Sequence, residues 1–158
     1  MAAVSPGARV LSLWRSCAGL PFGRALFGFL FGRTVPYSAT IGATVLDLSP
    51  GHARLALRDR RAVRNHLGSI HAVALTNLGE LASGLAMTTA LPAGVRGIVL
   101  RIETVYLKKA RGTLLCDCRV EVPEVSGDLN HEVFAEIRDG GGDIVASVRV
   151  TWRLGLVP

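Results

Sequence analysis

The stretch Ile70–Leu91, IHAVALTNLGELASGLAMTTAL, decides the fold of this chain. Apolar residues occur almost all round a helix drawn over it, and Glu80 is its one formal charge. Its length alone would permit a membrane span. A carboxylate at the bilayer midplane is costly, however, and the sequence on both sides has the pattern of strands. We therefore expect a buried central helix over Ile70–Ala90, capped by Ser69, in a soluble protein.

Segments of alternating apolar and polar residues surround this helix. The pattern predicts two strands before it and four after it, with turns at Ser49–Gly51 and Gly140–Gly142. In the third strand, Ile98, Leu100 and Ile102 alternate with charged residues, which predicts one buried face and one wet face. The expected strands are Tyr37–Leu48, His52–Arg58, Val95–Leu107, Gly112–Val122, Asn130–Asp139 and Asp143–Leu154.

These elements predict an α+β fold in which an antiparallel sheet of five or six strands curls around one long helix. This is the hotdog arrangement. A single sheet of this kind leaves one edge and one flank of the helix uncovered. We therefore expect the chain to pair with a second copy, as a homodimer or as a dimer of dimers.

We expect residues 1–33 to form an amphipathic helical segment ahead of the hotdog domain, which we place at residues 34–158. Two short helices are expected here, Arg9–Ala18 and Phe22–Phe31, separated at Gly19–Pro21. The first 46 residues carry four arginines and no acid. A transit peptide or an interfacial helix is the alternative, so contact of this segment with a membrane surface stays open.

Composition narrows the class of protein. The chain has 158 residues, of which 49% are hydrophobic and 19% charged, which excludes a disordered chain. The net charge of +6 permits a polyanionic ligand, but no nucleic-acid-binding motif is recognisable. Cys116 and Cys118 point to one face of a strand and lack a second pair that would suggest a metal site. Buried free thiols suit a reducing compartment, hence the cytoplasm.

Glu80 is the candidate catalytic residue. It is the one acid between Asp59 and Glu103. Burial of its helix should raise its pKa, which makes it a candidate base or nucleophile. The alternative is an exposed glutamate, or one paired with an arginine. Upstream, the amides at the start of the helix, around His71–Val73, have no internal acceptor and could hold an oxyanion.

The residues around this helix resemble a known family. The spacing Asn65-x-x-Gly68-x-x-His71, followed nine residues later by Glu80, resembles hotdog acyl-CoA thioesterases of the phenylacetate-degradation (PaaI-like) type. Within that superfamily, the sequence motifs resemble most a bacterial branch whose function is unknown. That branch is marked by Pro36-Tyr37, by the run from Asn65 to Ala72, and by a Tyr-Leu-Lys-Lys-Ala-Arg-Gly motif at residues 106–112. The resemblance covers roughly Thr34–Leu154.

The resemblance implies a role for each of these residues in an acyl-CoA thioesterase. Glu80 would activate water or attack the thioester carbonyl, and Asn65 would orient the water or the substrate. The N–H of Ala72 would polarise the thioester oxygen, and His71 would support the loop. The site would form at the dimer interface, with Asn65 and Ala72 facing Glu80 of the other copy. No cofactor is implied, because coenzyme A is part of the substrate.

Two features leave hydrolysis open. The family's two glycines after the histidine are Ala72 and Val73 here, and the polar residue that many relatives carry on the next strand is Val99. A non-catalytic hotdog dimer that binds an acyl chain or acyl-thioester is therefore the second hypothesis. Lys108, Lys109 and Arg111 are candidates to bind the phosphates of coenzyme A. The arginines of residues 58–64 are an equal alternative, and either group could instead be a solvated turn.

Overall fold

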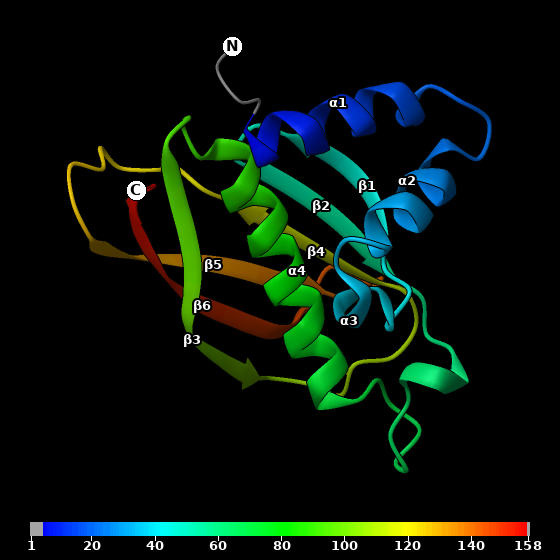
Figure 1. Cartoon of the computed structure of the whole chain (residues 1–158). Coiled ribbons are helices and arrows are strands. Elements are labelled where there is room, and N and C mark those ends of the chain that lie inside the picture. The colour runs from blue at the N-terminus through cyan, green and yellow to red at the C-terminus, as the bar shows by residue number, and fades with distance from the viewer. Residues whose placement is uncertain (1–4, 158) are drawn as a thin grey trace.

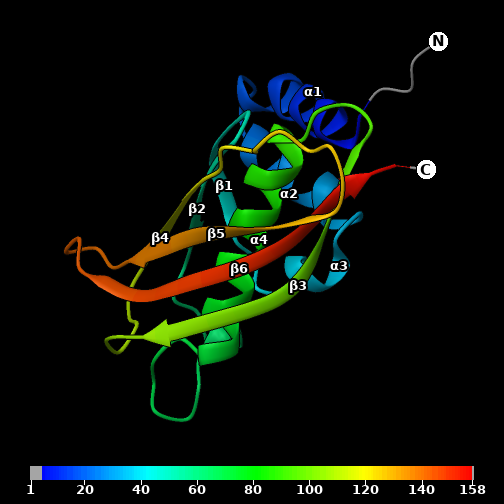
Figure 2. The same cartoon turned by 90° about the vertical axis from the view of Figure 1, so that its left-hand side faces the viewer.

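The computed structural model describes residues 5–157 and contains one six-stranded antiparallel sheet. Its strand order is β1-β2-β4-β5-β6-β3, so β1 and β3 are the two edges. Figure 1 shows the sheet curled around a central helix, α4, and Figure 2 shows β3 passing along the open side of that helix. The strands are β1 (Thr44–Ser49), β2 (His52–Leu57), β3 (Val95–Tyr106), β4 (Leu114–Arg119), β5 (Leu129–Arg138) and β6 (Ile144–Leu156).

The central helix α4 spans Ala72–Ala90 and contacts all six strands. Its approach to the sheet depends on Gly79, where an added Cβ would lie 2.4 Å from the Val148 side chain on β6. This is the predicted hotdog fold, with six strands and the helix between the second and third. The helix begins two residues later than expected, because His71 rather than Ser69 is its N-cap. Within residues 5–157, no helix is long and apolar enough to cross a membrane.

The N-terminal segment forms helices α1 (Pro6–Ala18) and α2 (Gly23–Gly32), close to the predicted bounds. Residues 1–4 of this segment lie outside the described residues, as does Pro158 of the hotdog domain. Trp14 and Phe27 are buried and meet edge to face, with ring centroids 5.1 Å apart. Because α1 packs on α4 and α2 on β1, the segment shares the core of the sheet and helix.

The first predicted strand begins too early. Residues Pro36–Ala39 form a short helix, α3, and the strand starts only at Thr44. Pro36 occupies the first turn of this helix, where its missing N–H costs nothing. A left-handed Gly42 (φ 63°) then separates the helix from the strand. Tyr37 is consequently a surface residue of α3, not a strand residue.

The prediction that the apolar residues of the third strand are buried is wrong for the single chain. Ile98, Leu100 and Ile102 are 64%, 50% and 38% exposed. A β-bulge between Val99 and Arg101 breaks the simple alternation. The strand is also an edge of the sheet, and no other strand of residues 5–157 pairs with its free side.

The cysteine prediction is confirmed. Cys116 and Cys118 are free and buried on the inner face of β4, and Cys17 is free and buried on α1. Burial raises the pKa of the Cys118 thiol to about 12, and the pKa of Cys116 is raised as well, also by burial. Both thiols of β4 are therefore protonated core residues at neutral pH.

Candidate functional site

The loop that leads into α4 is held together by Asn65. Its side-chain Oδ1 accepts hydrogen bonds from the backbone N–H of Leu67 (2.9 Å) and of Ser69 (3.2 Å). Its Nδ2 donates to the Ser69 hydroxyl at 3.1 Å. A second amide hydrogen remains on Nδ2. Asn65 therefore fixes the shape of the loop and still has one donor to offer.

His71 and Ala72 form the start of α4. The His71 Nδ1 accepts a hydrogen bond from the Val73 N–H at 3.1 Å, so this ring nitrogen carries no proton. The carbonyl of His71 accepts from Ala74 and Leu75. The N–H of Ala72 has no acceptor within residues 5–157, and Ala72 is half-buried. This amide is available to a ligand oxygen, at the positive end of the helix dipole.

Glu80 lies two turns further along α4, half-buried. Burial raises its pKa above the ordinary value of 4.5, and a hydrogen bond from Ser38 partly opposes that shift. The Ser38 hydroxyl, on α3, is 3.5 Å from Oε2. No lysine or arginine of the described chain pairs with Glu80. The predicted rise in pKa is confirmed, and the alternative of an arginine pair is wrong.

A cavity of about 300 Å³ adjoins Glu80. Gly84, one turn later on α4, leaves space there: an added Cβ would lie 3.9 Å from Glu80 Oε1 and 4.0 Å from the Trp152 ring. The other walls are mostly apolar and come from both halves of the chain. They include Val10, Phe31 and Val35 from the N-terminal segment, and Leu81, Leu85 and Trp152 from the hotdog domain.

Several polar groups lie near Glu80. Two buried atoms, Asn77 Oδ1 and Trp152 Nε1, have no hydrogen-bond partner within the described chain. Asn77 precedes Glu80 by one turn and lines a second cavity, of about 240 Å³, together with His71 and Tyr37. The helical spacing of Asn77 and Glu80 was visible in the sequence. The Ser38 contact was not, because it joins residues that are 42 positions apart.

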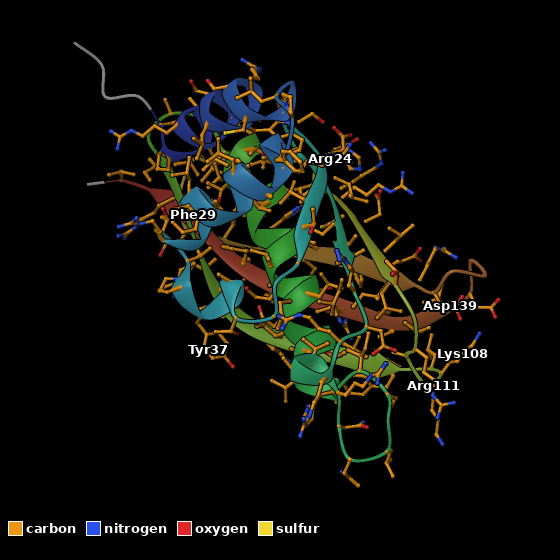
Figure 3. The ribbon with its side chains drawn as sticks, turned by 90° about the vertical axis from the view of Figure 1, so that its right-hand side faces the viewer. Arg24, Phe29, Tyr37, Lys108, Arg111 and Asp139 are labelled. Carbon is orange, nitrogen blue, oxygen red and sulfur yellow. The ribbon has the colours of Figure 1, made fainter. Side chains whose placement is uncertain are left out.

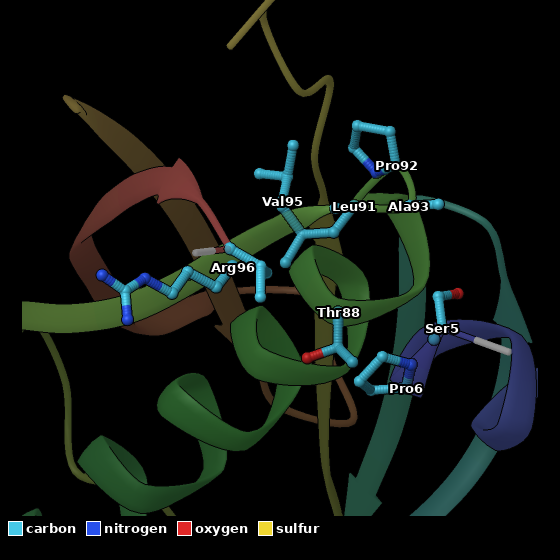
Figure 4. Close-up of a pocket in the computed structure, with 12 residues that line it drawn as sticks. Ser5, Pro6, Thr88, Leu91, Pro92, Ala93, Val95 and Arg96 are labelled. Carbon is cyan, nitrogen blue, oxygen red and sulfur yellow. The ribbon is translucent and has the colours of Figure 1, made fainter. Parts of the chain in front are cut away.

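A further cavity, of about 690 Å³, lies at the far end of α4 (Figure 4). It is bounded by the start of α1, with Pro6 beside Thr88, and by the turn from Leu91 to Gly97. Arg96 is its one titratable lining residue among those described. Without a carboxylate, histidine or thiol, this cavity lacks the groups that acyl transfer would need.

The three residues of the predicted basic cluster have different surroundings in the structure. Lys108 Nζ binds Asp139 at 2.7 Å and Asp143 at 2.5 Å, and these hydrogen bonds raise its pKa. Figure 3 shows Lys108, Asp139 and Arg111 at the same end of the molecule. Lys109 and Arg111 are exposed. Their loop adjoins the start of α4, since the Ile70 N–H donates to the Ala110 carbonyl at 2.8 Å.

Ala72 and Glu80 cannot both contact one substrate carbonyl within a single chain. They are eight residues apart on the same helix, which corresponds to about 12 Å along its axis. An oxyanion donor and a base must both lie within about 3 Å of the reacting atoms. The structure thus places Asn65 on the loop that leads into α4, His71 and Ala72 at the start of that helix, and Glu80 two turns further along it.

Solved structures of other proteins have the same arrangement of sheet and helix. A structure described as "genomics APC5556" superposes with a TM-score of 0.82 at 27% identity, covering 95% of this chain and all of the other. A Pseudomonas aeruginosa protein, PA5026, described as a "Probable Thioesterase", gives 0.75 at 22% identity over 87% of this chain and 97% of the other. Both likenesses cover most of each chain, and they show that this chain has the same hotdog fold as these two proteins.

The family can also be stated. A family model described as "Domain of unknown function (DUF4442)" matches residues 23–154, and the chain belongs to this family. A Halobacterium salinarum protein named "Putative esterase VNG_1336C" is 35% identical over 85 residues. That match spans 51% of this chain and 56% of the other protein, so it compares about half of each.

Proposed function

We propose that this protein is an acyl-CoA thioesterase whose catalytic carboxylate is Glu80. The observation that carries the proposal is a half-buried glutamate with a raised pKa and no cationic partner among the described residues, beside a cavity of about 300 Å³. A carboxylate in such a place is poorly stabilised by the protein. Its environment suits a group that takes a proton from water during the reaction.

The reaction follows from the chemistry of the groups present. Glu80 removes a proton from a water molecule, and the oxygen of that water attacks the thioester carbonyl. The oxyanion that forms accepts a hydrogen bond from the Ala72 N–H. The carbonyl then re-forms as the carbon–sulfur bond breaks. The thiolate of coenzyme A takes the proton that Glu80 removed from water and leaves as a thiol, which restores the Glu80 carboxylate. His71 holds the helix start in place by its cap on Val73.

A second copy completes this site. The separation of about 12 Å between Ala72 and Glu80 on one helix requires that they act in different copies. The exposed apolar residues of β3, together with the free strand edge, provide the surface for that pairing. The proposed assembly is a homodimer in which Asn65 and Ala72 of one copy face Glu80 of the other.

The acyl group and the coenzyme A part of the proposed substrate contact different residues. The cavity beside Glu80 accepts an apolar acyl group, because Leu81, Leu85 and Phe31 line it. Lys109 and Arg111 are the exposed cations that remain for the phosphates of coenzyme A, whereas Lys108 is held by two aspartates. We therefore assign Lys108 a structural role at the β5–β6 turn within this proposal.

Hydrolysis of a panel of acyl-CoA thioesters, from acetyl to long-chain and aryl, tests the proposal, with free coenzyme A as the readout. We expect turnover of at least one thioester, lost in Glu80→Gln and kept in Glu136→Gln on the outer face of β5. Binding of an acyl-CoA without release of the thiol would instead favour a non-catalytic acyl-binding dimer. The exposed Val73, in place of a glycine at the helix start, is the feature that favours this second function.

A further inference from the structure

The outer side of α2 carries a stripe of exposed apolar side chains. Phe22, Leu26, Phe29 and Leu30 follow the spacing of a single helical face. Their side chains are 90%, 42%, 64% and 36% exposed. Figure 3 shows Phe29 at the outer edge of α2. We call these four residues the α2 stripe.

The opposite side of α2 is also apolar, and this side packs against the rest of the protein. Phe27 is fully buried, with its ring against Trp14 and stacked on Phe31 at 5.5 Å. A helix that faces water on one side normally carries polar residues there. The α2 stripe does not, so this helix has a second apolar face with no partner among the described residues. Contiguous apolar surface of this kind marks an interaction site.

Phe22 adds an observation that packing does not explain. It lies in the left-handed region, with φ 61°, and is the one residue other than glycine with positive φ among those described. This conformation is unfavourable for a residue with a side chain. The phenyl group that it presents at the α1–α2 turn is nevertheless almost fully exposed. The Phe22 carbonyl accepts from the N–H groups of Ala25 and Leu26 at the start of α2, but its exposed phenyl group makes little use of the described chain.

The charged side chains of the two N-terminal helices and of the residues beside them, over residues 5–46, are all of one sign. Arg15, Arg24 and Arg33 are exposed on or beside the two helices, and residues 1–46 contain no acid. No arginine of these helices pairs with a carboxylate in the part of the chain that the structure describes. The Arg33 guanidinium lies 5.8 Å from the centre of the Phe29 ring. A phenyl and a guanidinium side by side match the acyl boundary and the phosphate layer of a bilayer.

The position of α2 distinguishes this surface from the proposed dimer contact. Figure 1 shows β3 and α2 on opposite sides of α4, so pairing along β3 leaves the α2 stripe free. A second copy bound face to face on this stripe would bring arginines against arginines. We propose that the α2 stripe docks on the surface of an anionic phospholipid bilayer, with Phe22 and Phe29 at the acyl boundary and Arg33 at the phosphates. This goes beyond thioester hydrolysis and does not depend on it.

Co-sedimentation of the full chain with sucrose-loaded vesicles tests the proposal. We expect binding to vesicles of about three parts phosphatidylcholine to one part phosphatidylglycerol. Binding to pure phosphatidylcholine vesicles should be weaker by about tenfold or more. Salt at about 0.5 M should weaken binding to the mixed vesicles. The double variant Phe22→Asn/Phe29→Ser keeps every charge, and asparagine tolerates the backbone at position 22. Its partition to anionic vesicles should fall about tenfold or more.

Phe134→Ser is the matched control, because it removes a similarly exposed phenyl (54%) from β5. It should bind vesicles like the wild type. Equal binding of the double variant and the wild type, or no vesicle binding at all, overturns the proposal. So does equal binding to the neutral and the anionic vesicles. Light scattering that shows a smaller assembly for the double variant would also overturn it, by assigning the α2 stripe to a contact between copies.

Discussion

Glu80 has few favourable contacts for a charged group, and that property separates a catalytic from a structural role. Glu80→Gln keeps the size of the side chain but removes the basic oxygen. We expect thioester hydrolysis to fall by about 10²–10⁴-fold. Stability should stay the same or rise, because the variant removes a partly buried carboxylate whose one partner is Ser38 at 3.5 Å. Hydrolysis and thermal melting, measured on one preparation, check both statements.

The control for this variant is Glu136→Gln, which changes a glutamate paired with Arg138 on β5. It should leave hydrolysis unaltered. A Glu80→Gln protein that hydrolyses thioesters at the wild-type rate but melts earlier would contradict the catalytic assignment. That result would place Glu80 among structural residues.

The raised pKa of Glu80 predicts the direction of two pH dependences. As a base, Glu80 must be ionised, so kcat/KM should rise with pH through a value above 4.5. The folded state binds this proton more tightly than the unfolded state. The Glu80 contribution to stability is therefore most favourable at low pH and declines as pH rises through the folded pKa. Urea unfolding of the wild type should show this decline relative to Glu80→Gln. An activity profile that is flat from pH 4 to 7 would be evidence against Glu80 as the base.

Asn65 holds its loop with Oδ1 and offers Nδ2 to a ligand, so two substitutions separate these roles. Asn65→Ala removes both groups and should lower the melting temperature as well as turnover. Asn65→Asp retains the acceptor for the N–H groups of Leu67 and Ser69, so it should melt near the wild type yet hydrolyse slowly. Full activity in Asn65→Asp would show that Asn65 serves only the loop.

At the scale of single residues, the sequence identified those whose role follows from local spacing. Glu80 stood out as one acid in an apolar helix, and its raised pKa is confirmed. Ser38 could not be identified, because its contact with Glu80 depends on the helical turn at Pro36. Lys108 was assigned to a ligand because the facing aspartates, Asp139 and Asp143, belong to a distant turn.

Among the elements, the loops at the start of α4 are joined through one carboxylate. Asp59 accepts from Arg64 Nε at 2.6 Å and from the Gly112 N–H at 2.9 Å. These hydrogen bonds lower the pKa of Asp59 below 3.8. Its contribution to stability is therefore present above that value and lost as pH falls through the folded pKa. Asp59→Asn should lower Tm by about 2–4 °C at neutral pH, and the difference should disappear in acid.

Thermal melting of both proteins between neutral and acidic pH measures this difference. Asp128→Asn is a suitable control, because Asp128 is exposed and its nearest cation, Arg153, is 3.8 Å away. A deficit of Asp59→Asn that is the same at every pH would mean that the carboxylate charge is not what joins these loops.

The order and type of the long elements could be predicted from periodicity, whereas the start of the first strand and the bulge within the third could not. Tyr37–Ile41 alternates enough to suggest a strand, but no neighbouring strand pairs with it, and Pro36 initiates a helix instead. The bulge at Leu100 in β3 depends on its pairing with β6 and has no signal in the local sequence. Both errors occur where tertiary pairing decides the local conformation.

For the whole molecule, the sheet that curls around α4 ends in β3, whose free edge pairs with no other strand of residues 5–157. Ile98, Leu100 and Ile102 of β3 are exposed in the single chain, although their pattern predicted burial. Such an edge is a template for pairing with another chain. The apolar pattern of β3 is thus consistent with burial of these residues in an assembly of two copies. The proposed site can be tested through that assembly.

A site shared between two copies predicts complementation between inactive variants. Glu80→Gln retains a normal Asn65, and Asn65→Asp retains a normal Glu80. When the two are mixed in equal amounts in denaturant and refolded together, half of the dimers should contain one chain of each kind. Each mixed dimer has one site with both residues intact and one site with neither. The mixture should therefore recover about a quarter of the wild-type activity per site, as follows from two-fold symmetry.

Thioester hydrolysis before and after co-refolding measures this recovery, with each variant refolded alone as the control. The separately refolded variants, mixed afterwards, should stay inactive if the copies exchange slowly. Recovery well below a quarter, while ion-exchange chromatography resolves a mixed dimer of intermediate charge, would place Asn65 and Glu80 of one site on the same chain. Because those residues lie at separate positions along one helix and its leading loop, such a result would also require a substrate long enough to contact both.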